Sequence, residues 1–353
     1  MKVVTTIGLD LAKNVFQVFG RDADQNVVFN KQLRRSQVLK FFAALPPCLT
    51  GMEACAGAHY WSRELTKLGH TVKLMVPKHV KAYLKRGKTD AADAEAICEA
   101  VSRAHVTEVP AKSEAQQCAL MLHKLREALL KQRTKQVNMI RAHIAELGRV
   151  EAIGHEGFKR LTAMVLDETG QALPEAARNA LKPMLFSLTA TEVSISQLDA
   201  EISKAHRHDA TSRRLETVPG VGRLGAAAFA ASVGDGAKLF ASGRNFAAAL
   251  GLTPKLDGTG GKVRLGSITK QGNGYLRRLL YLGAVAVLSN AQRKPGKASA
   301  WMLRLLAEKP FKTAAIALAN KMARTIWALL VRGGTYDAKH QPAVQAARQL
   351  AWQ

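Results

Sequence analysis

The N-terminal third of the chain alternates between strand-type and helix-type patterns in a fixed order, and this order limits the possible folds more than any other feature. Runs of β-forming residues bounded by short polar turns indicate strands. These runs cover 3–9, 14–19, 26–29, a short stretch ending at Met52, and 71–76. Helix-type segments cover 36–44, 58–68 and a stretch beginning near Thr89. The order βββαβαβα predicts a mixed sheet with helices packed against it.

This order matches the ribonuclease H type of layout, in which the first and fourth strands are central neighbours and the last helix crosses them. Four acidic residues occupy the positions that such a layout brings together. Asp10 ends the first strand and Glu53 follows the fourth. Asp90 and Asp93 share one face of the last helix, because residues three apart on a helix are neighbours. We therefore expect the four carboxylates to converge.

Converging carboxylates repel one another, so such a cluster is tolerable only when cations neutralise it. Mg²⁺ prefers oxygen ligands and keeps coordination positions for water and phosphate oxygens. A two-metal site of this kind activates a nucleophile and stabilises the leaving oxygen in phosphodiester cleavage. The sequence therefore predicts Mg²⁺ binding by the four acids. Taken singly, each acid also fits an ordinary turn or the first turn of a helix, where the helix dipole favours negative charge.

Basic residues outnumber acidic ones by 52 to 27, a formal net charge of +25 spread along the chain. This favours a polyanionic partner, nucleic acid before a membrane surface. Aromatic residues make up 6% of the chain and do not alternate with the basic runs, so contact with the nucleic-acid backbone is expected rather than base stacking. The candidate contacts are Lys85, Arg86 and Lys88 beside the acidic pair, and Lys262, Arg264, Lys270, Arg277 and Arg278 in the cationic stretch 255–294.

A long helical region follows Pro110. Ser113 and Gln116 have the spacing of a capping box. Apolar residues at steps of three and four continue from there to Leu147 and favour a coiled-coil-like arm. A second amphipathic segment, within 193–202, can pair with the first inside the chain or across a dimer.

From about residue 212, glycine-rich turns alternate with alanine-rich helices. The turn PGVG, residues 219–222, lies between two helical segments and has the pattern of a helix-hairpin-helix, in which the backbone N–H groups of Gly220 and Gly222 can meet a phosphate. The alternative is an ordinary glycine turn between helices.

A second glycine-rich loop, around Thr259, follows the motif GLTP. Lys262, Arg264 and Lys270 follow closely in sequence. A hydroxyl among cations suits attack on phosphorus, because the cations stabilise the added negative charge. A surface hairpin with no covalent role explains the same residues.

The two most apolar windows, 279–290 and 313–331, are too short or are interrupted by Lys321 and Arg324, so no membrane span is expected. The first residues lack a signal-peptide pattern, and we expect a cytosolic protein. Cys48, Cys55, Cys98 and Cys118 show no metal-ligand spacing and are expected to be reduced.

Six ordered motifs identify a resemblance that runs nearly end to end: IGLDLAKN, GMEACAGAHYW, KTDAADA, PGVG, GLTP and TGGKVRLGSITKQGNGYLRR. The chain resembles transposases of the insertion sequence 110 family, and within it the 1111 subgroup. The resemblance implies a RuvC-like DEDD domain over 1–110, a coiled-coil region over 111–210 and a helical transposase domain with a helix-hairpin-helix over 211–353. Asp10, Glu53, Asp90 and Asp93 take the DEDD positions and would hold Mg²⁺.

The same resemblance implies a serine nucleophile in the C-terminal glycine-rich loop that joins covalently to DNA, with the active parts assembled between protomers. Here Thr259 occupies that position, and Ser267 is a weaker candidate. The implied partners are double-stranded DNA of the element ends and target, a structured non-coding guide RNA, and further copies of the chain in a dimer or tetramer. The implied location is the bacterial cytoplasm, at the nucleoid.

Two other functions fit part of the sequence. A structure-selective nuclease of the Holliday-junction resolvase type needs only the four acids. A non-enzymatic architectural DNA-binding protein needs only the PGVG turn and the basic loop, with the acids in structural roles.

Overall fold

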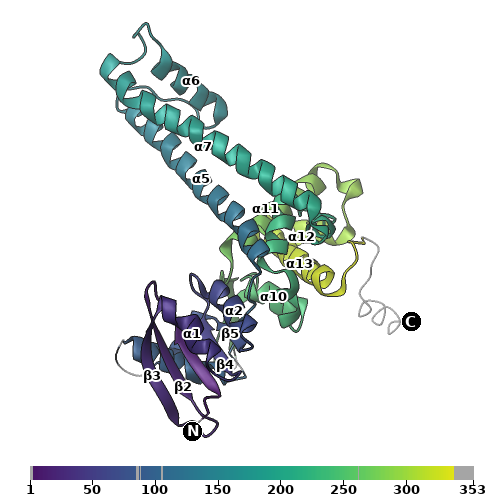
Figure 1. Ribbon diagram of the computed structural model, residues 1–353. Helices are drawn as coiled ribbons and strands as arrows, with labels where there is room; N and C mark the ends of the chain where they lie inside the picture. Colours follow the sequence, from purple (N-terminus) through teal and green to yellow (C-terminus); the bar gives the residue numbers. More distant parts are fainter. Residues whose placement is uncertain (1–2, 85–86, 88, 105, 261, 338–353) are drawn as a thin grey trace, which may run out of the picture. The chain divides into compact units, whose positions relative to one another are not determined.

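The computed structural model describes residues 3–84, 87, 89–104, 106–260 and 262–337 (Figure 1). Contacts group the chain into two compact units. Unit 1 comprises 1–117 and 232–245, and unit 2 comprises 118–231 and 246–353. The three-part division at residues 110 and 210 stays a prediction.

Within the described part of unit 1, six strands form one mixed sheet in the order β3-β2-β1-β4-β5-β6. The strands are β1 (Thr6–Asp10), β2 (Val15–Arg21), β3 (Val27–Arg34), β4 (Leu49–Glu53), β5 (Thr71–Met75) and β6 (Glu108–Val109). β1 runs antiparallel to β2 and parallel to β4. The predicted mixed sheet and the adjacency of the first and fourth strands are confirmed. β6, which the sequence analysis did not predict, pairs antiparallel with β5.

Helices lie on both faces of this sheet (Figure 1). They are α1 (Val38–Ala43), α2 (Ala58–Lys67), α3 (Pro77–Val80) and α4 (Asp90–Val101), with short 3₁₀ turns η1 (Arg35–Gln37) and η2 (Lys81–Tyr83). Because strand side chains alternate, Ile7 of β1 packs with Phe42 of α1 and Leu65 of α2 on one face. On the other face Phe19 packs against Ala94 of α4.

Unit 2 contains an antiparallel pair of long helices, α5 (Glu114–Ala145) and α7 (Glu175–His208), with α6 (His155–Leu166) between them in sequence (Figure 1). The predicted capping box of α5 is confirmed, since Ser113 and Gln116 exchange hydrogen bonds of 2.9 and 3.1 Å. Gln136 of α5 donates to Ser187 of α7 over 2.8 Å. The two helical segments therefore pair within the chain.

α7 continues through Pro183, so the amphipathic segment predicted within 193–202 is part of a longer helix that begins at Glu175. Pro183 lies on the exposed side, while Leu181 and Leu185 are buried in the apolar cluster with Ile140 of α5 and Leu161 of α6. Proline removes one backbone hydrogen bond. Packing on both sides of the proline maintains the helix.

The remaining described part of unit 2 is mainly helical. It contains α8 (Ala210–Glu216), most of α9 (Arg223–Ser232), the end of α10 (Gly243–Ala249), the hairpin β7 (Pro254–Thr259) and β8 (Lys262–Ile268), α11 (Gly274–Arg293), α12 (Ala300–Glu308), α13 (Phe311–Arg332) and the 3₁₀ turn η4 (Pro295–Lys297). The last residue of α9, the whole 3₁₀ turn η3 (Gly234–Leu239) and the start of α10 belong to unit 1 by their contacts. A mixed α/β N-terminal region followed by a helical C-terminal region agrees with the predicted fold class.

Among the described residues, α13 is the one helix that is long and apolar enough to cross a membrane by length and composition. Half of its most apolar window is buried within the protein, and Ala315 and Ala319 are fully buried. A core helix passes the same test, so this is weak evidence for a span.

All four cysteines are free. Cys48 and Cys98 are buried, whereas Cys55 and Cys118 are exposed.

Candidate metal centre and nucleic-acid interface

The two strand acids lie at the ends of neighbouring parallel strands. The register pairs Thr6 with Leu49 and Gly8 with Gly51. Continued along both strands, this register sets Asp10 beside Glu53. Both acids are partly buried. The sheet alone therefore fixes the relative position of half of the predicted quartet.

Two glycines allow α4 to approach this pair. Strand side chains alternate between faces, so Gly8 shares a face with Asp10, and Gly51 shares one with Glu53. A Cβ at Gly8 would overlap the carbonyl oxygen of Ala94 in α4. A Cβ at Gly51 would lie 2.7 Å from the Cβ of Val101. The acids thus face α4, and the absent side chains let the helix lie directly on the strands.

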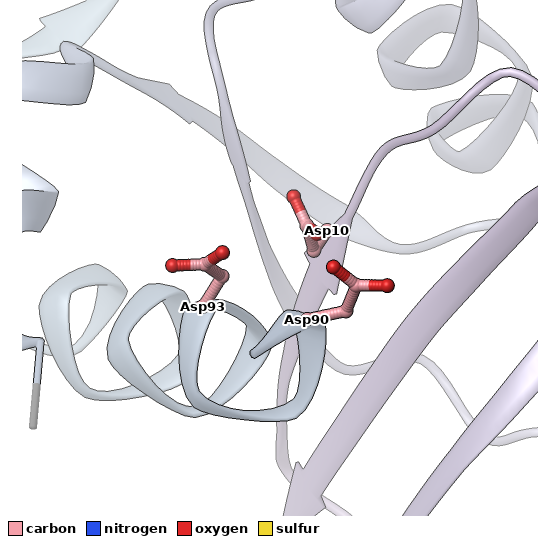
Figure 2. A group of neighbouring side chains, drawn as sticks. All are labelled: Asp10, Asp90 and Asp93. Atoms are coloured by element: carbon pink, nitrogen blue, oxygen red, sulfur yellow. The ribbon is translucent and has the colours of Figure 1, made fainter. Parts of the chain in front are cut away.

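The first turn of α4 carries the other two acids. Thr89 caps the helix, because its hydroxyl accepts a hydrogen bond of 3.2 Å from the backbone N–H of Ala92. One carboxylate oxygen from each of Asp10, Asp90 and Asp93 lies within 4.8 Å of the other two. Figure 2 shows Asp90 and Asp93 on one side of α4, with the Asp10 carboxyl between them. We call these three residues the acid cluster.

The electrostatics agree with this geometry. Burial raises the pKa of the Asp10 carboxyl to about 6, and the negative charges of Asp93 and Asp90 add to the effect. A raised pKa means that the ionised form is disfavoured when no cation is present. Asp90 and Asp93 also lie at the N-terminus of α4, where the helix dipole favours negative charge.

Glu53 lies beside the acid cluster without belonging to the group of three. Burial raises its pKa, and Asp93 raises it further, while the cationic Lys81 lowers it. Its charge in turn raises the pKa of Asp10. The structure therefore brings three of the four predicted acids within ligand distance of one another and places the fourth within electrostatic reach.

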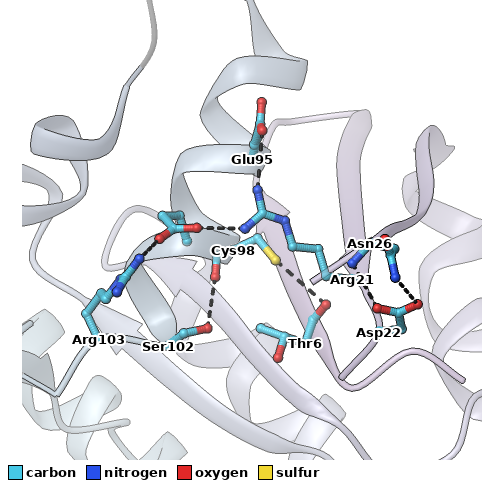
Figure 3. Close-up of polar contacts among 9 residues, drawn as sticks. Thr6, Arg21, Asp22, Asn26, Glu95, Cys98, Ser102 and Arg103 are labelled. Carbon is cyan, nitrogen blue, oxygen red and sulfur yellow. Dashed lines mark hydrogen bonds and ion pairs between the residues drawn. The ribbon is translucent and has the colours of Figure 1, made fainter. Parts of the chain in front are cut away.

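Ion pairs attach the outer face of α4 to the sheet (Figure 3). Arg21, the last residue of β2, donates to Glu99 over 2.6 Å and to Glu95 over 3.4 Å. Glu99 also pairs with Arg103. Cys98, on the buried face of α4, donates through its thiol to the backbone oxygen of Thr6 over 3.7 Å. These contacts hold the helix that carries Asp90 and Asp93.

The predicted nucleophile lies in unit 2, in the hairpin formed by β7 and β8. Thr259 is exposed and pairs across the turn with Lys262, and Asp257 pairs with Arg264. Paired residues share a face of an antiparallel ribbon, so these four side chains lie on one face. Leu256 and Leu265 pair on the other face, with 71% and 70% of each residue exposed.

The other predicted contacts of this region differ in their surroundings. Ser267 and Lys270 are exposed. Arg277 donates to the backbone oxygens of Leu250 and Gln271 over 3.0 and 2.8 Å, so it anchors the loops on either side of the hairpin. Arg278 is exposed and pairs with Glu127 over 3.1 Å.

The PGVG turn connects α8 to α9. Gly220 has a left-handed backbone, with φ 85°, and an added Cβ would lie 2.8 Å from the carbonyl oxygen of Gly283 in α11. Gly222 is exposed, with open space around the position of an added Cβ. Gly220 thus has a packing role, and Gly222 is the accessible backbone position. The predicted contacts Lys85, Arg86 and Lys88 lie outside the described residues.

The roles of Gly8 and Gly51 were not predicted from the sequence. A signal was present, because each glycine precedes a predicted acid by two residues and therefore shares its face of the strand. The need for glycine becomes visible only when α4 is placed against the sheet.

Comparisons with known proteins agree along the chain. Residues 212–299 match the Transposase IS116/IS110/IS902 family, and residues 7–148 match the IS110-type DEDD transposase family. The chain is 46% identical to a probable family 20 transposase of Pseudomonas aeruginosa, over 94% of this chain and 98% of that protein. It is 37% identical to the transposase for insertion sequence element IS1328 of Yersinia enterocolitica, over 96% and 100%. It is 36% identical to the transposase for IS1111A of Coxiella burnetii, over 95% and 92%.

Proposed function

Because the chain belongs to the IS110/IS116/IS902 transposase family and is a DNA-transposing enzyme, we propose that it excises and inserts its element by Mg²⁺-dependent strand cleavage and rejoining. The observation that carries the proposal is the acid cluster, in which three carboxylates each place one oxygen within 4.8 Å of the others. The second element of the proposal is the exposed hydroxyl of Thr259 among cations.

DEDD transposases generally use a divalent metal, and the residues of this chain fit one. The donor set consists of carboxylate oxygens, which Mg²⁺ prefers over the nitrogen and sulfur donors that soft metals select. Burial, together with the negative charges of Asp93, Asp90 and Glu53, raises the pKa of Asp10, so a bound cation would favour its ionised form. Asp10, Asp90 and Asp93 would hold the ion, with Glu53 beside them. Bound there, Mg²⁺ would supply charge stabilisation to the scissile phosphate.

The chain's own groups would divide the remaining work. Lys81, whose charge lowers the pKa of Glu53, would offset negative charge beside the acid cluster. Thr259 would attack the scissile phosphorus through Oγ1. The bond from Oγ1 to phosphorus forms as the bond to the deoxyribose oxygen breaks, and the threonine proton passes to that leaving oxygen. Rejoining reverses the exchange on a second DNA end.

Lys262 and Arg264 support this role for Thr259 because they share its face of the hairpin. Their charges would stabilise the additional charge on the phosphoryl oxygens. Threonine has the hydroxyl of the serine that the family resemblance implies, with a stiffer side chain. Ser267 is the alternative hydroxyl on the same hairpin.

The proposed partners are double-stranded DNA of the element ends and of the target, a guide RNA, and further copies of the chain in a dimer or tetramer. DNA binding follows from the family, and the net charge of +25 suits both nucleic acids. We place the protein in the bacterial cytoplasm at the nucleoid, where its DNA is. The α5–α7 arm is the proposed coiled-coil region, and α8 with α9 is the proposed helix-hairpin-helix.

One observation favours a second function. All four acids lie in unit 1, apart from the hairpin of Thr259 in the other unit. A resolvase-type nuclease that cuts with activated water would need unit 1 alone.

The test is to incubate the full chain with DNA carrying the element's ends and Mg²⁺ and to look for a protein-linked strand. Wild type and Thr259→Ser are expected to form the adduct, and Thr259→Ala to form none. An adduct with the alanine variant would move the nucleophile to another hydroxyl, with Ser267→Ala as the next variant. Strand cleavage by Thr259→Ala without any adduct would favour the nuclease.

A further inference from the structure

A cavity of about 590 Å³ opens in unit 1 on the face of the sheet covered by α1 and α2. Its wall includes Asn14 from the β1–β2 loop, Arg34 at the end of β3, Arg35 at the start of η1, and Tyr60 and Trp61 from α2. Asn14, both arginines and Tyr60 are exposed, so the cavity is open to solvent. Its size suits a single nucleotide.

The cavity combines two kinds of side chain that bind nucleotides. The Arg35 guanidinium lies 5.1 Å from the Trp61 ring centroid, and its backbone N–H donates to the Asn14 carbonyl over 2.8 Å. Among the described residues, Arg34 and Arg35 form no ion pair with a carboxylate, so both charges remain for an anionic ligand. Tyr60 is 41% exposed and packs edge-on against the nearly buried Trp61 with ring centroids 5.3 Å apart.

The cavity lies at the end of the sheet that carries the acid cluster. β1 and β4 both end there, at Asp10 and Glu53, and β2 begins there at Val15, paired with Arg34 at the end of β3. Asn14 follows Asp10 by four residues, which span at most about 14 Å. The cavity and the acid cluster lie on opposite faces of the sheet, so a strand reaching both must pass over this end.

We propose that this cavity binds one nucleotide of the DNA strand that passes the acid cluster, with its base stacked on Tyr60 and its phosphate held by Arg34 and Arg35. A base can stack on a side chain only when it is unpaired, so the site selects a single-stranded segment. The identification of DNA as the ligand depends on the proposed function, because DNA is the strand that would reach the acid cluster. The prediction that the cavity binds a nucleotide depends only on the residues of the cavity.

Binding is measured on the full chain in EDTA, so that no cleavage contributes, by fluorescence anisotropy with a short labelled DNA single strand and the matching duplex. Tyr60→Ala is expected to weaken single-strand binding about tenfold, and Tyr60→Phe to change it by less than about twofold, because stacking needs the ring and not the hydroxyl. Duplex binding is expected to change little in either variant.

The arginine contact has its own readout. Arg34→Gln is expected to reduce the slope of log affinity against log salt by about 0.7, the value for one phosphate contact on a single strand. Lys40→Gln, which removes the same charge from an exposed position on α1 outside the cavity, is the matched control and is expected to retain the slope.

A photoreactive base in the strand provides a measurement that does not depend on any variant. Cross-links in wild type are expected on α2 at Tyr60. Unchanged affinity in a folded Tyr60→Ala variant, or cross-links found only elsewhere, would overturn the proposal. If Tyr60→Ala weakened binding of an RNA strand of the same sequence but not of the DNA strand, the proposal that DNA occupies the cavity would be wrong. Because the binding assay contains EDTA and no metal, a failure of nucleotide binding in the cavity is distinguishable from a failure of cleavage or of Thr259 adduct formation.

Discussion

The acid cluster and the Thr259 hairpin carry the two proposed parts of the chemistry, and they are built in opposite ways. Asp10 ends a central strand of a sheet covered on both faces, and Asp93 lies on a helix that contacts the strands through two glycines. Thr259 lies on a two-stranded ribbon in which every described residue of β7 is exposed. Packing in the core therefore determines the geometry of the acid cluster. The described residues of the hairpin, in contrast, are mostly exposed to solvent.

This difference separates stability from activity. Replacing an acid changes the repulsion inside a packed unit, so it affects folding as well as chemistry. Replacing a hairpin residue removes little packing, and a two-stranded ribbon contributes little stability by itself. Substitutions in the two regions should therefore be distinguishable by combining a thermal melt with an activity assay.

The largest expected effect is on cleavage. Asp93→Asn should reduce Mg²⁺-dependent cleavage by about a thousandfold or more, the order seen when a principal catalytic group is removed. Its melting temperature without metal should equal or exceed that of wild type, because one repelling charge is gone.

Mg²⁺ titration sharpens this contrast with the hairpin. At about a hundred times its Kd, a ligand stabilises a protein by about 2.7 kcal/mol. Mg²⁺ should therefore raise the melting temperature of wild type and of Thr259→Ala. Asp93→Asn should lose most of this increase. An equal shift in all three proteins would show that the acid cluster is not the metal site.

Glycine substitutions give the next effect. Gly8→Ala should destabilise unit 1 by about 3 kcal/mol, since its Cβ would overlap the backbone of α4 and the helix must move. Gly266→Ala is the control in β8, where the nearest atom to an added Cβ is at 3.7 Å, and should change stability by less than about 0.5 kcal/mol. Urea denaturation measures both. An equal loss of unfolding free energy in Gly8→Ala and Gly266→Ala would show that the two regions do not differ in packing at these glycines.

Acid should destabilise the helices of unit 2. Burial lowers the pKa of His123 to about 4, and its Nδ1 lies 3.0 Å from the hydroxyl of Tyr275. The unfolded chain takes up this proton near pH 6.5 and the folded chain only near pH 4, so stability is lost as pH falls through that window. The loss should be about 2 kcal/mol, measured as unfolding free energy at pH 7 and pH 4.5. His123→Gln should flatten this dependence, and an unchanged pH profile would assign the acid sensitivity to other groups.

The smallest expected effect is on the apolar face of the hairpin. Leu256→Thr with Leu265→Thr should change the unfolding free energy by less than about 0.5 kcal/mol, because both leucines are already exposed. Leu280→Thr in α11, where the side chain is buried, should cost about 3 kcal/mol in the same assay. A comparable loss from the hairpin pair would mean that the ribbon packs against another part of the chain.

Much of the fold could be predicted from the sequence because its signals are local. The alternation of strands and helices placed Asp10 and Glu53 at strand ends, and the Ser113–Gln116 capping box marked the start of α5. The interior of the arm was harder to predict. Its buried positions include His123 and Gln136. The ring of His123 hydrogen-bonds to Tyr275, and the amide nitrogen of Gln136 donates to Ser187, both far along the chain. A pattern that counts only apolar residues cannot detect such partners.

The site shows the same limit. The predicted carboxylates come together in three of four cases, yet the requirement for glycine at position 8 depends on where α4 lies. The cavity lined by Arg34 and Tyr60 could not be predicted from the sequence for a related reason. Its basic and aromatic residues are not neighbours in the sequence, and the sheet and α2 bring them together from separate segments.

The antiparallel pairing of α5 with α7 makes the length of the arm adjustable. Arg126 faces Asp199 and Gln136 faces Ser187, so a step forward along one helix matches a step back along the other. Deleting about seven residues from each helix at facing positions, roughly two turns, would keep the remaining partners matched. The arm could then be shortened while the acid cluster and the Thr259 hairpin keep their sequences, which separates the contribution of reach from that of chemistry.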